Sequence, residues 1–320
     1  MKEPMLLRPV GKDYLWGGDR LKTEYYKNLK ETPLAETWEC SVHPNGPSIV
    51  AGGAFKGQTL ASVLEKHPEY LGDRSDGKLS ILVKLIDANA ALSVQVHPDD
   101  EYALINEGQN GKFEMWYVLD ALPGAKLIHG FAHDVTPEQL EKSMRDGDIA
   151  KHLKSVEIHK GDVFFIPPGK VHAIGAGALI VEIQQSSDVT YRVYDYDRVD
   201  KNGKKRELHF AKAMDVLDMK AENAVRQMPR LVQYRPGCAR QILGRCKYFE
   251  TERIQISMGY SFIVNESSFQ VLLCIEGRGG LETKGDYRPL RFAKGDCIFI
   301  PAGMGKCLIL GHATLLKIRT

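Results

Sequence analysis

The sequence predicts a mainly β protein made of two copies of one small β-barrel, with a few inserted helices. Two observations support this prediction: short apolar runs recur along most of the chain, and part of the chain repeats itself. The runs are rich in Val, Ile, Leu and Phe and are bounded by Gly, Pro, Asp or Asn, a spacing typical of an all-β sandwich or barrel. In order, they are LSILVKLIDA (79–88), MWYVLDA (115–121), KLIHGF (126–131), DVFFIPPG (162–169), ALIVEIQQ (178–185), VLLCIEG (271–277), DCIFIPAG (296–303) and TLLKIRT (314–320).

Helical patterns are fewer, and we expect three inserted helices at about 59–70, 135–154 and 208–225. The middle one carries the clearest signals. Thr136 can cap its first turn, and Pro137 takes the first helical position, where a proline is tolerated. Apolar residues then recur at helical spacing along one face.

The internal repeat constrains the architecture most strongly. KGDVFFIPPGKVH (160–172) and KGDCIFIPAGMGK (294–306) agree at seven of thirteen positions, and each reads as a turn, a buried strand and a Pro/Gly bend. Upstream, YVLDALPGAKL (117–127) resembles VLLCIEGRGGL (271–281). We therefore expect a first domain at 1–230 that contains the helices and a near-minimal second domain at 231–320. The boundary should fall near 228–237.

The two copies are not chemically equivalent. His172 in the first copy aligns with Lys306 in the second, and nothing like the QVH of residues 95–97 precedes the second copy. If one barrel holds a metal, it is the first, and the second is then a degenerate copy.

Composition excludes several classes of function. With 43 Lys and Arg against 41 Asp and Glu, the chain has no strong overall field to attract nucleic acid or an anionic membrane, so we expect neither partner. The start of the sequence lacks the apolar h-region of a secretory signal, and no run approaches 18 apolar residues, which predicts a cytoplasmic protein. Six scattered cysteines without a CxxC pair argue against a thiolate zinc site and a disulfide scaffold.

Three segments carry a candidate metal site. Gln95 and His97 are two residues apart, which on a strand places both side chains on one face, and Lys112 and Glu114 have the same relation. His172 follows the IPPG bend. Two imidazoles and a carboxylate are a common zinc set that leaves room for an amide, water or substrate.

At these motifs the chain closely resembles the type I mannose-6-phosphate isomerases, in their short bacterial form. The resemblance extends through most of the chain as an ordered series of motifs: LWGGDRL (15–21), AETWECSVHPNGPS (35–48), VKLIDANAALSVQVHPDD (83–100), GKFEMWYVLD (111–120), FFIPPGKVHAIGAG (164–177) and VEIQQSSDVTYRVYDYDR (181–198).

The resemblance implies two cupin (jelly-roll) barrels, of which only the first is catalytic. It also implies interconversion of mannose 6-phosphate and fructose 6-phosphate through an enediol(ate). One zinc ion (Zn2+) per chain would be held by four side chains: Gln95, His97, Glu114 and His172. Arg192 would be the active-site arginine, and the pocket for the hexose 6-phosphate would be lined by Lys84, Ser93, Lys112 and Glu182. Lys84 and Lys112 would suit the phosphate.

Several alternatives stay open at this point. The general base could be zinc-bound hydroxide, Glu182 or a lysine with a depressed pKa. The same residue types fit an iron-dependent cupin dioxygenase, a non-catalytic sugar-binding bicupin or an isomerase for another hexose phosphate. The oligomeric state is equally open, between a monomer and a weak homo-oligomer.

Overall fold

The computed structural model describes residues 2–320 except 200–202, 224, 229 and 285–287, and its described strands form three antiparallel sheets. The chain is mainly β with few helices, as predicted. Each apolar run named above lies on a strand of the structure.

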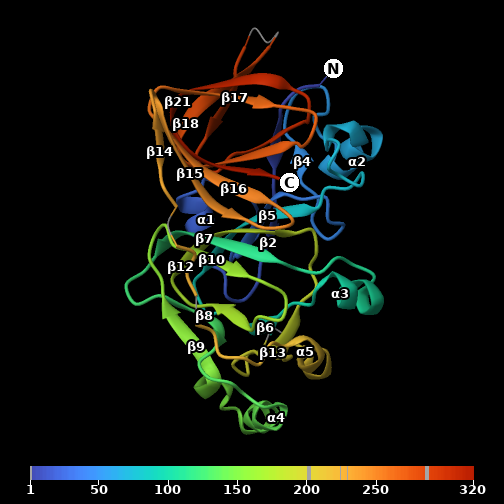
Figure 1. The fold of residues 1–320 in the computed structure, drawn as a ribbon, viewed down its shortest axis with the longest axis vertical. Helices are drawn as coiled ribbons and strands as arrows, with labels where there is room; N and C mark the ends of the chain where they lie inside the picture. The colour runs from blue at the N-terminus through green and yellow to red at the C-terminus, as the bar shows by residue number, and fades with distance from the viewer. Residues whose placement is uncertain (1, 200–202, 224, 229, 285–287) are drawn as a thin grey trace.

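Two sheets make up the lower half of the molecule in Figure 1. The six-stranded sheet has the order β10 (Val163–Ile166), β7 (Glu114–Ala121), β12 (Ala178–Gln185), β5 (Ile81–Ala88), β3 (Glu36–Cys40) and β2 (Val10–Lys12). The five-stranded sheet has the order β13 (Tyr191–Tyr194), β6 (Val94–Val96), β11 (His172–Ile174), β8 (Lys126–Phe131) and β9 (Leu153–Glu157).

The third sheet, with ten strands, gathers the C-terminal part of the chain. Its order is β14 (Gln233–Arg235), β15 (Cys238–Arg245), β16 (Glu250–Ile256), β21 (Gly305–Arg319), β18 (Gln270–Thr283), β20 (Cys297–Ile300), β1 (Met5–Arg8) and β4 (Ile49–Val50), with β17 (Gly259–Val264) on β21 and β19 (Leu290–Ala293) on β18. Strands β1 and β4 come from the start of the chain, and Leu6 of β1 pairs with Ile298 of β20. No pattern in the sequence indicates this pairing.

The six-stranded sheet lies between the other two and has a core on each face (Figure 1). Side chains alternate along a strand, so Val83 of β5 packs in a cluster with Leu273 of the ten-stranded sheet. Ile86 of the same strand packs in a cluster with Leu127 of the five-stranded sheet. Strand β5 is therefore buried along its whole length, which explains its continuous apolar pattern.

The helices are shorter than the sequence suggested. They are α1 (Arg20–Thr23), α2 (Leu60–Lys66), α3 (Asp100–Glu107), α4 (Pro137–Asp146) and α5 (Phe210–Val216), with 3-10 turns at Pro68–Tyr70 and Ile149–His152. The expected 135–154 helix ends early because Gly147 takes a left-handed conformation (φ +73°), and strand β9 begins at Leu153. The expected 208–225 helix ends where Leu217 becomes extended, and its residue 224 lies outside the described residues.

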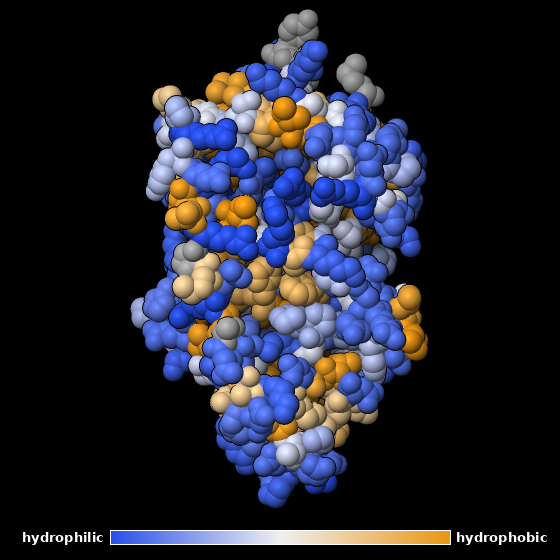
Figure 2. Space-filling view, viewed as in Figure 1, coloured by the Kyte–Doolittle hydropathy of each residue, from blue (hydrophilic) through white to orange (hydrophobic). Residues whose placement is uncertain are grey.

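Helix α3 was not expected from the sequence, although Asp99 caps its start and Gly108 ends it in a left-handed conformation. Figure 2 shows a mostly hydrophilic face with a hydrophobic patch over α3, where Leu104 and Ile105 are exposed. None of the helices in the described part of the chain has the length and apolar character needed to cross a membrane.

The repeated Lys-Gly-Asp segments adopt the same turn in both halves. Gly161 and Gly295 have φ of +93° and +95°, and their N–H groups donate to the carbonyl oxygens of Val118 and Cys274, each at 2.8 Å. The alignment of 117–127 with 271–281 made residue 272 the equivalent of Val118. The two turns instead make Cys274 its equivalent, which shifts that alignment by two residues.

Candidate active site

Three side chains that could hold a metal meet between the five-stranded and six-stranded sheets. His97 follows β6, Glu114 begins β7 and His172 begins β11. One ligand atom from each lies within 4.8 Å of the others, and all three side chains are buried. Nε2 of His97 lies 3.1 Å from Nε2 of His172 and 3.2 Å from Oε1 of Glu114. The structure thus brings together the predicted imidazoles and carboxylate.

The hydrogen bonds of these residues fit a bound cation. Nδ1 of His172 donates to the carbonyl oxygen of Lys170 at 2.7 Å, which leaves the lone pair of Nε2 free. Within the described residues, Nδ1 of His97 and both carboxylate oxygens of Glu114 lack a hydrogen bond of good geometry. Buried acceptors without hydrogen bonds are costly, and a bound cation would add to the ion pair that Glu114 makes with Lys112. The amide of Gln95 lies 3.3 Å from Nε2 of His172.

Burial sets the protonation states that a metal requires. Desolvation lowers the pKa of His97 to about 3 and that of His172 to about 4, so both rings are neutral at pH 7. Burial alone would raise the pKa of Glu114, but the nearby Lys112 ammonium and the two imidazoles lower it well below its usual value. Two neutral imidazoles and a carboxylate are the forms in which these side chains bind a metal.

Lys112 shows that this cluster attracts positive charge. Its Nζ lies 2.9 Å from Oε1 of Glu114 and 3.2 Å from Nε2 of His97, and the side chain is buried. The lysine and the predicted metal would share one carboxylate.

A pocket of about 430 Å³ opens beside the cluster. Gln95 and Lys112 belong to its lining and connect it with the buried imidazoles of His172 and His97. All the predicted substrate-binding residues line it, namely Lys84, Ser93, Lys112 and Glu182, together with Arg192. Two further cations line it that sequence reasoning missed, Lys12 and Arg206.

A buried ion pair forms one wall of this pocket. Nζ of Lys84 lies 2.8 Å from Oε1 of Glu182 and 3.9 Å from Glu36, and the indole of Trp116 donates to Oε2 of Glu182 at 2.9 Å. Burial and the nearby charge of Glu114 raise the pKa of Glu182 despite its lysine partner.

Two arginines approach the pocket from the chain after β12. Arg192 lies on β13 opposite Gln95, and its Nη1 donates to the carbonyl oxygen of Glu207 at 2.7 Å. Arg206 donates from Nε to Oδ2 of Asp195 at 2.8 Å and makes a second contact with Oδ1 of the same carboxylate. This paired contact fixes the guanidinium plane of Arg206 beside the pocket.

Comparison with known proteins agrees with this geometry. Residues 5–118 match the family described as phosphomannose isomerase type I, catalytic domain, and residues 241–320 match the mannose-6-phosphate isomerase cupin domain. A mannose-6-phosphate isomerase of Streptococcus mutans is 38% identical and aligns over 94% of this chain and 93% of its own. The chain belongs to the type I phosphomannose isomerase family.

Solved structures agree with the membership in this family. The mannose 6-phosphate isomerase of Bacillus subtilis is 36% identical, covers 99% of both chains and superposes with a TM-score of 0.91. A zinc-bound mannose 6-phosphate isomerase, 17% identical, has the same fold with a TM-score of 0.76 over 98% of each chain.

In this type I phosphomannose isomerase family member, the residues that sequence reasoning missed are of two kinds. Trp116 and Asp195 lie within quoted motifs and act on the pocket through Glu182 and Arg206. Lys12 stands outside every motif, and its Nζ lies 4.4 Å from the ring centroid of Trp38. Only the fold brings it to the pocket, so no sequence signal could have identified it.

Proposed function

We propose that this chain interconverts mannose 6-phosphate and fructose 6-phosphate in the pocket lined by Gln95 and Lys112. The single observation that carries the proposal is the meeting of His97, Glu114 and His172 beneath a pocket rich in cations. Membership in the phosphomannose isomerase family supports the choice of substrate.

We assign one zinc ion to this cluster, held by His97, Glu114 and His172, with Gln95 as an amide ligand. Buried imidazole and carboxylate donors in this number suit zinc, and a relative of the same fold is described as zinc-bound. When bound, the metal would supply a Lewis acid for the oxygens at C1 and C2 of the substrate.

Isomerisation removes the proton at C2 of the aldose and returns a proton to C1, and an enediolate lies between the two steps. The costly species is therefore an oxyanion, which fixed positive charge stabilises. Arg192 is the cation we assign to this charge, because it lies beside Gln95 in the sheet and its Nε is buried without a hydrogen-bond partner among the described residues. Ser93 lines the same pocket and can hydrogen-bond to the sugar.

The substrate phosphate needs cations that are exposed to solvent in the free protein, so that the phosphate can replace their bound water. Lys84 and Lys112 are buried, so we assign them to the sugar end together with Glu182. Lys12 and Arg206 are partly exposed members of the same lining, and we assign the phosphate to them. The dianion then stays partly solvated, which lowers its desolvation cost.

We also propose that the chain contains two cupin units, a catalytic one at 1–230 and a degenerate one at 231–320, with β1 and β4 completing the sheet of the second. The repeated Lys-Gly-Asp turn supports the duplication. Lys306 stands where the first unit has His172, so the second unit lacks that imidazole.

A coupled assay for fructose 6-phosphate formed from mannose 6-phosphate tests this function. We expect activity that disappears on chelation and returns when zinc is added back. Glucose 6-phosphate serves as the parallel substrate, since comparable turnover of it would reject the choice of hexose. Activity that persists after measured removal of metal would reject the role of the cluster.

A further inference from the structure

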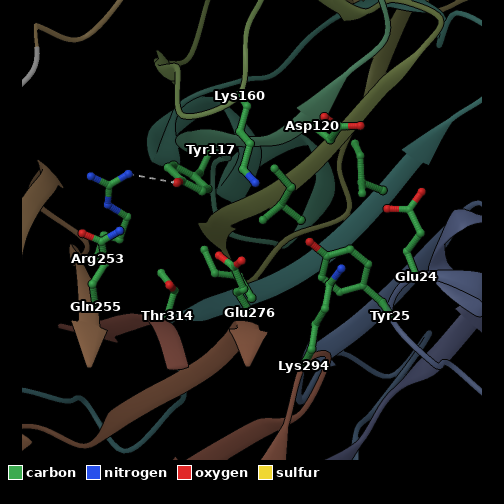
Figure 3. Close-up of a pocket in the computed structure, with 13 residues that line it drawn as sticks. Glu24, Tyr25, Tyr117, Asp120, Lys160, Arg253, Gln255, Glu276, Lys294 and Thr314 are labelled. Carbon is green, nitrogen blue, oxygen red and sulfur yellow. Dashed lines mark hydrogen bonds between the residues drawn. The ribbon is translucent and has the colours of Figure 1, made fainter. Parts of the chain in front are cut away.

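A second cavity, of about 330 Å³, lies between the six-stranded and ten-stranded sheets and shares no lining residue with the pocket described above. Figure 3 shows Lys160 reaching into it from one side and Lys294 from the other. Its apolar wall is formed by Leu119, Leu179 and Ile275.

The lining of this cavity comes in equivalent pairs from the two halves of the repeat. Lys160 and Lys294 each begin the Lys-Gly-Asp turn, and Asp120 and Glu276 each lie two residues after the strand residue on which that turn docks. In both halves the strand pairing is irregular at the residue just before this carboxylate. Regular pairing resumes at the carboxylate itself, where Asp120 pairs with Leu179 and Glu276 pairs with Thr314. The cavity thus lies where the two repeats face each other.

Among the described residues, none of the cations in this cavity forms an ion pair with a carboxylate. Lys160 makes no hydrogen bond or ion pair with the described residues, and Nζ of Lys294 has only the ring of Tyr25, 4.3 Å from its centroid. Arg253 is the third cation, and its Nη1 donates to the hydroxyl of Tyr117 at 3.4 Å. Lys160 and Lys294, which form no ion pair with a described carboxylate, favour an anionic ligand between them.

Three described carboxylates, Glu24, Asp120 and Glu276, also line the cavity, and they differ in their partners. Arg20 binds both Asp120 and Glu24, so these two carboxylates share one guanidinium, which offsets part of their charge. Glu276 has no such partner in the described chain and lines the cavity with Thr314. The Glu276 carboxylate can accept hydrogen bonds from hydroxyl groups, and the Thr314 hydroxyl can both accept and donate them.

We propose that this cavity binds a small hydroxylated organic phosphate, a monoester, separately from the isomerase site. The phosphate lies between Lys160 and Lys294 with Arg253 beside it, because a dianion is held best by several charge-assisted contacts. The hydroxyl groups of the ester face Glu276 and Thr314. The cavity volume falls at the lower end of the range of roughly 300–1,000 Å³ for small-molecule sites.

A ligand held there would bridge the two halves of the chain. Lys160 belongs to the turn before β10, and Lys294 belongs to the turn before β20, so one phosphate would contact two separate sheets. A ligand that binds only the folded state raises the free energy of unfolding. It would therefore protect the contact between the six-stranded and ten-stranded sheets.

Isothermal titration of the full chain with glycerol 3-phosphate, and separately with inorganic phosphate, tests the proposal. The variant is K160Q/K294Q, and the matched control is K66Q/K306Q, which removes two exposed lysines outside both pockets. Removing one charge-assisted hydrogen bond to the phosphate should weaken binding by roughly tenfold or more. We expect a binding component that is about 100-fold weaker in K160Q/K294Q and unchanged in the control.

The ester should bind more tightly than inorganic phosphate, because only the ester carries alcohol hydroxyl groups that extend from the phosphate to Glu276 and Thr314. Equal affinities would overturn the assignment of an ester. Identical isotherms for the wild type and K160Q/K294Q, or no binding by the wild type, would overturn the site itself. The isomerase assay is run on the same variants and should give wild-type rates. A failure of the isomerase proposal would therefore appear in the wild-type assay, separately from the binding measurements.

Discussion

The imidazole of His172 donates from Nδ1 to the carbonyl oxygen of Lys170, 2.7 Å away. A backbone carbonyl can only accept, so this contact fixes the tautomer of the ring and presents the Nε2 lone pair to His97. The PPGK bend that precedes His172 therefore orients the ring for cation binding in the absence of a metal. This orientation is a property of the chain itself.

Replacing Glu114 by Gln should remove most of the bound metal. Changes to groups that merely support a ligand typically cost about 10- to 100-fold in metal affinity, and loss of the only carboxylate among the three should exceed that. Metal content is measured after dialysis against a graded chelator. Glu107→Gln, on the surface helix α3, is the control, and retention of metal by Glu114→Gln at the control level would contradict the assignment.

The metal-free protein should lose stability as the pH falls below about 6.5. The folded-state pKa values of His97 and His172, about 3 and 4, lie below the usual value of 6.5, so the unfolded chain binds protons first. Each ring then costs up to about 1.4 kcal/mol per pH unit until its folded pKa is reached. Urea unfolding at pH 7, 6 and 5 measures the slope.

The variant His97→Gln/His172→Gln supplies the comparison for this slope. It lacks both rings, so its free energy of unfolding should fall less steeply over the same interval. Parallel slopes in the two proteins would show that other groups control the acid sensitivity.

Lys84→Met should destabilise the fold strongly. Lys84 and Glu182 are both buried and lie 2.8 Å apart, so removing the ammonium leaves a buried carboxylate without its counter-charge. Breaking such a pair typically costs about 3–5 kcal/mol. Chemical denaturation measures the decrease in stability, and Lys84→Met/Glu182→Gln should recover much of it. A double variant as unstable as the single one would indicate that packing, not charge, is disrupted.

The sequence predicted the candidate metal cluster because its members carry local signals. Gln95 and His97 share a strand face, and His172 follows a Pro/Gly bend that the repeat makes visible. Their approach to Glu114 across two sheets depends on the fold, yet the ordered motifs were sufficient to predict it.

Other features could not be predicted because they depend on distant pairing. Strand β1 is short, and nothing within it indicates that Leu6 pairs with Ile298 near the other end of the chain. Helix α3 was missed although Asp99 and Gly108 are ordinary capping residues, because the helix buries Ala103 alone and so shows no apolar stripe in the sequence. The charges that reach the pocket from outside the motifs, such as Lys12, follow from that same long-range packing.

Arg192→Ala should lower kcat far more than it changes KM. If the guanidinium stabilises the oxyanion that develops during isomerisation, its removal costs on the order of 100- to 1,000-fold in rate. Steady-state kinetics with mannose 6-phosphate measures both constants, and Arg192→Lys should restore part of the rate because it keeps the charge. A raised KM with unchanged kcat would assign Arg192 to substrate binding instead.

Arg206→Gln should show the opposite pattern. Asp195 holds the Arg206 guanidinium by two contacts beside the pocket, where we place the phosphate, far from the atoms that react. Hydrogen bonds to charged groups contribute about 1.5–3 kcal/mol, so KM should rise by about 10- to 100-fold while kcat stays within a small factor of the wild type. Arg235→Gln, on the exposed strand β14, is the charge-matched control. Asp195→Asn should raise KM by less than Arg206→Gln, because the guanidinium remains but its charged support is removed. An unchanged KM in Arg206→Gln would move the phosphate to another part of the pocket.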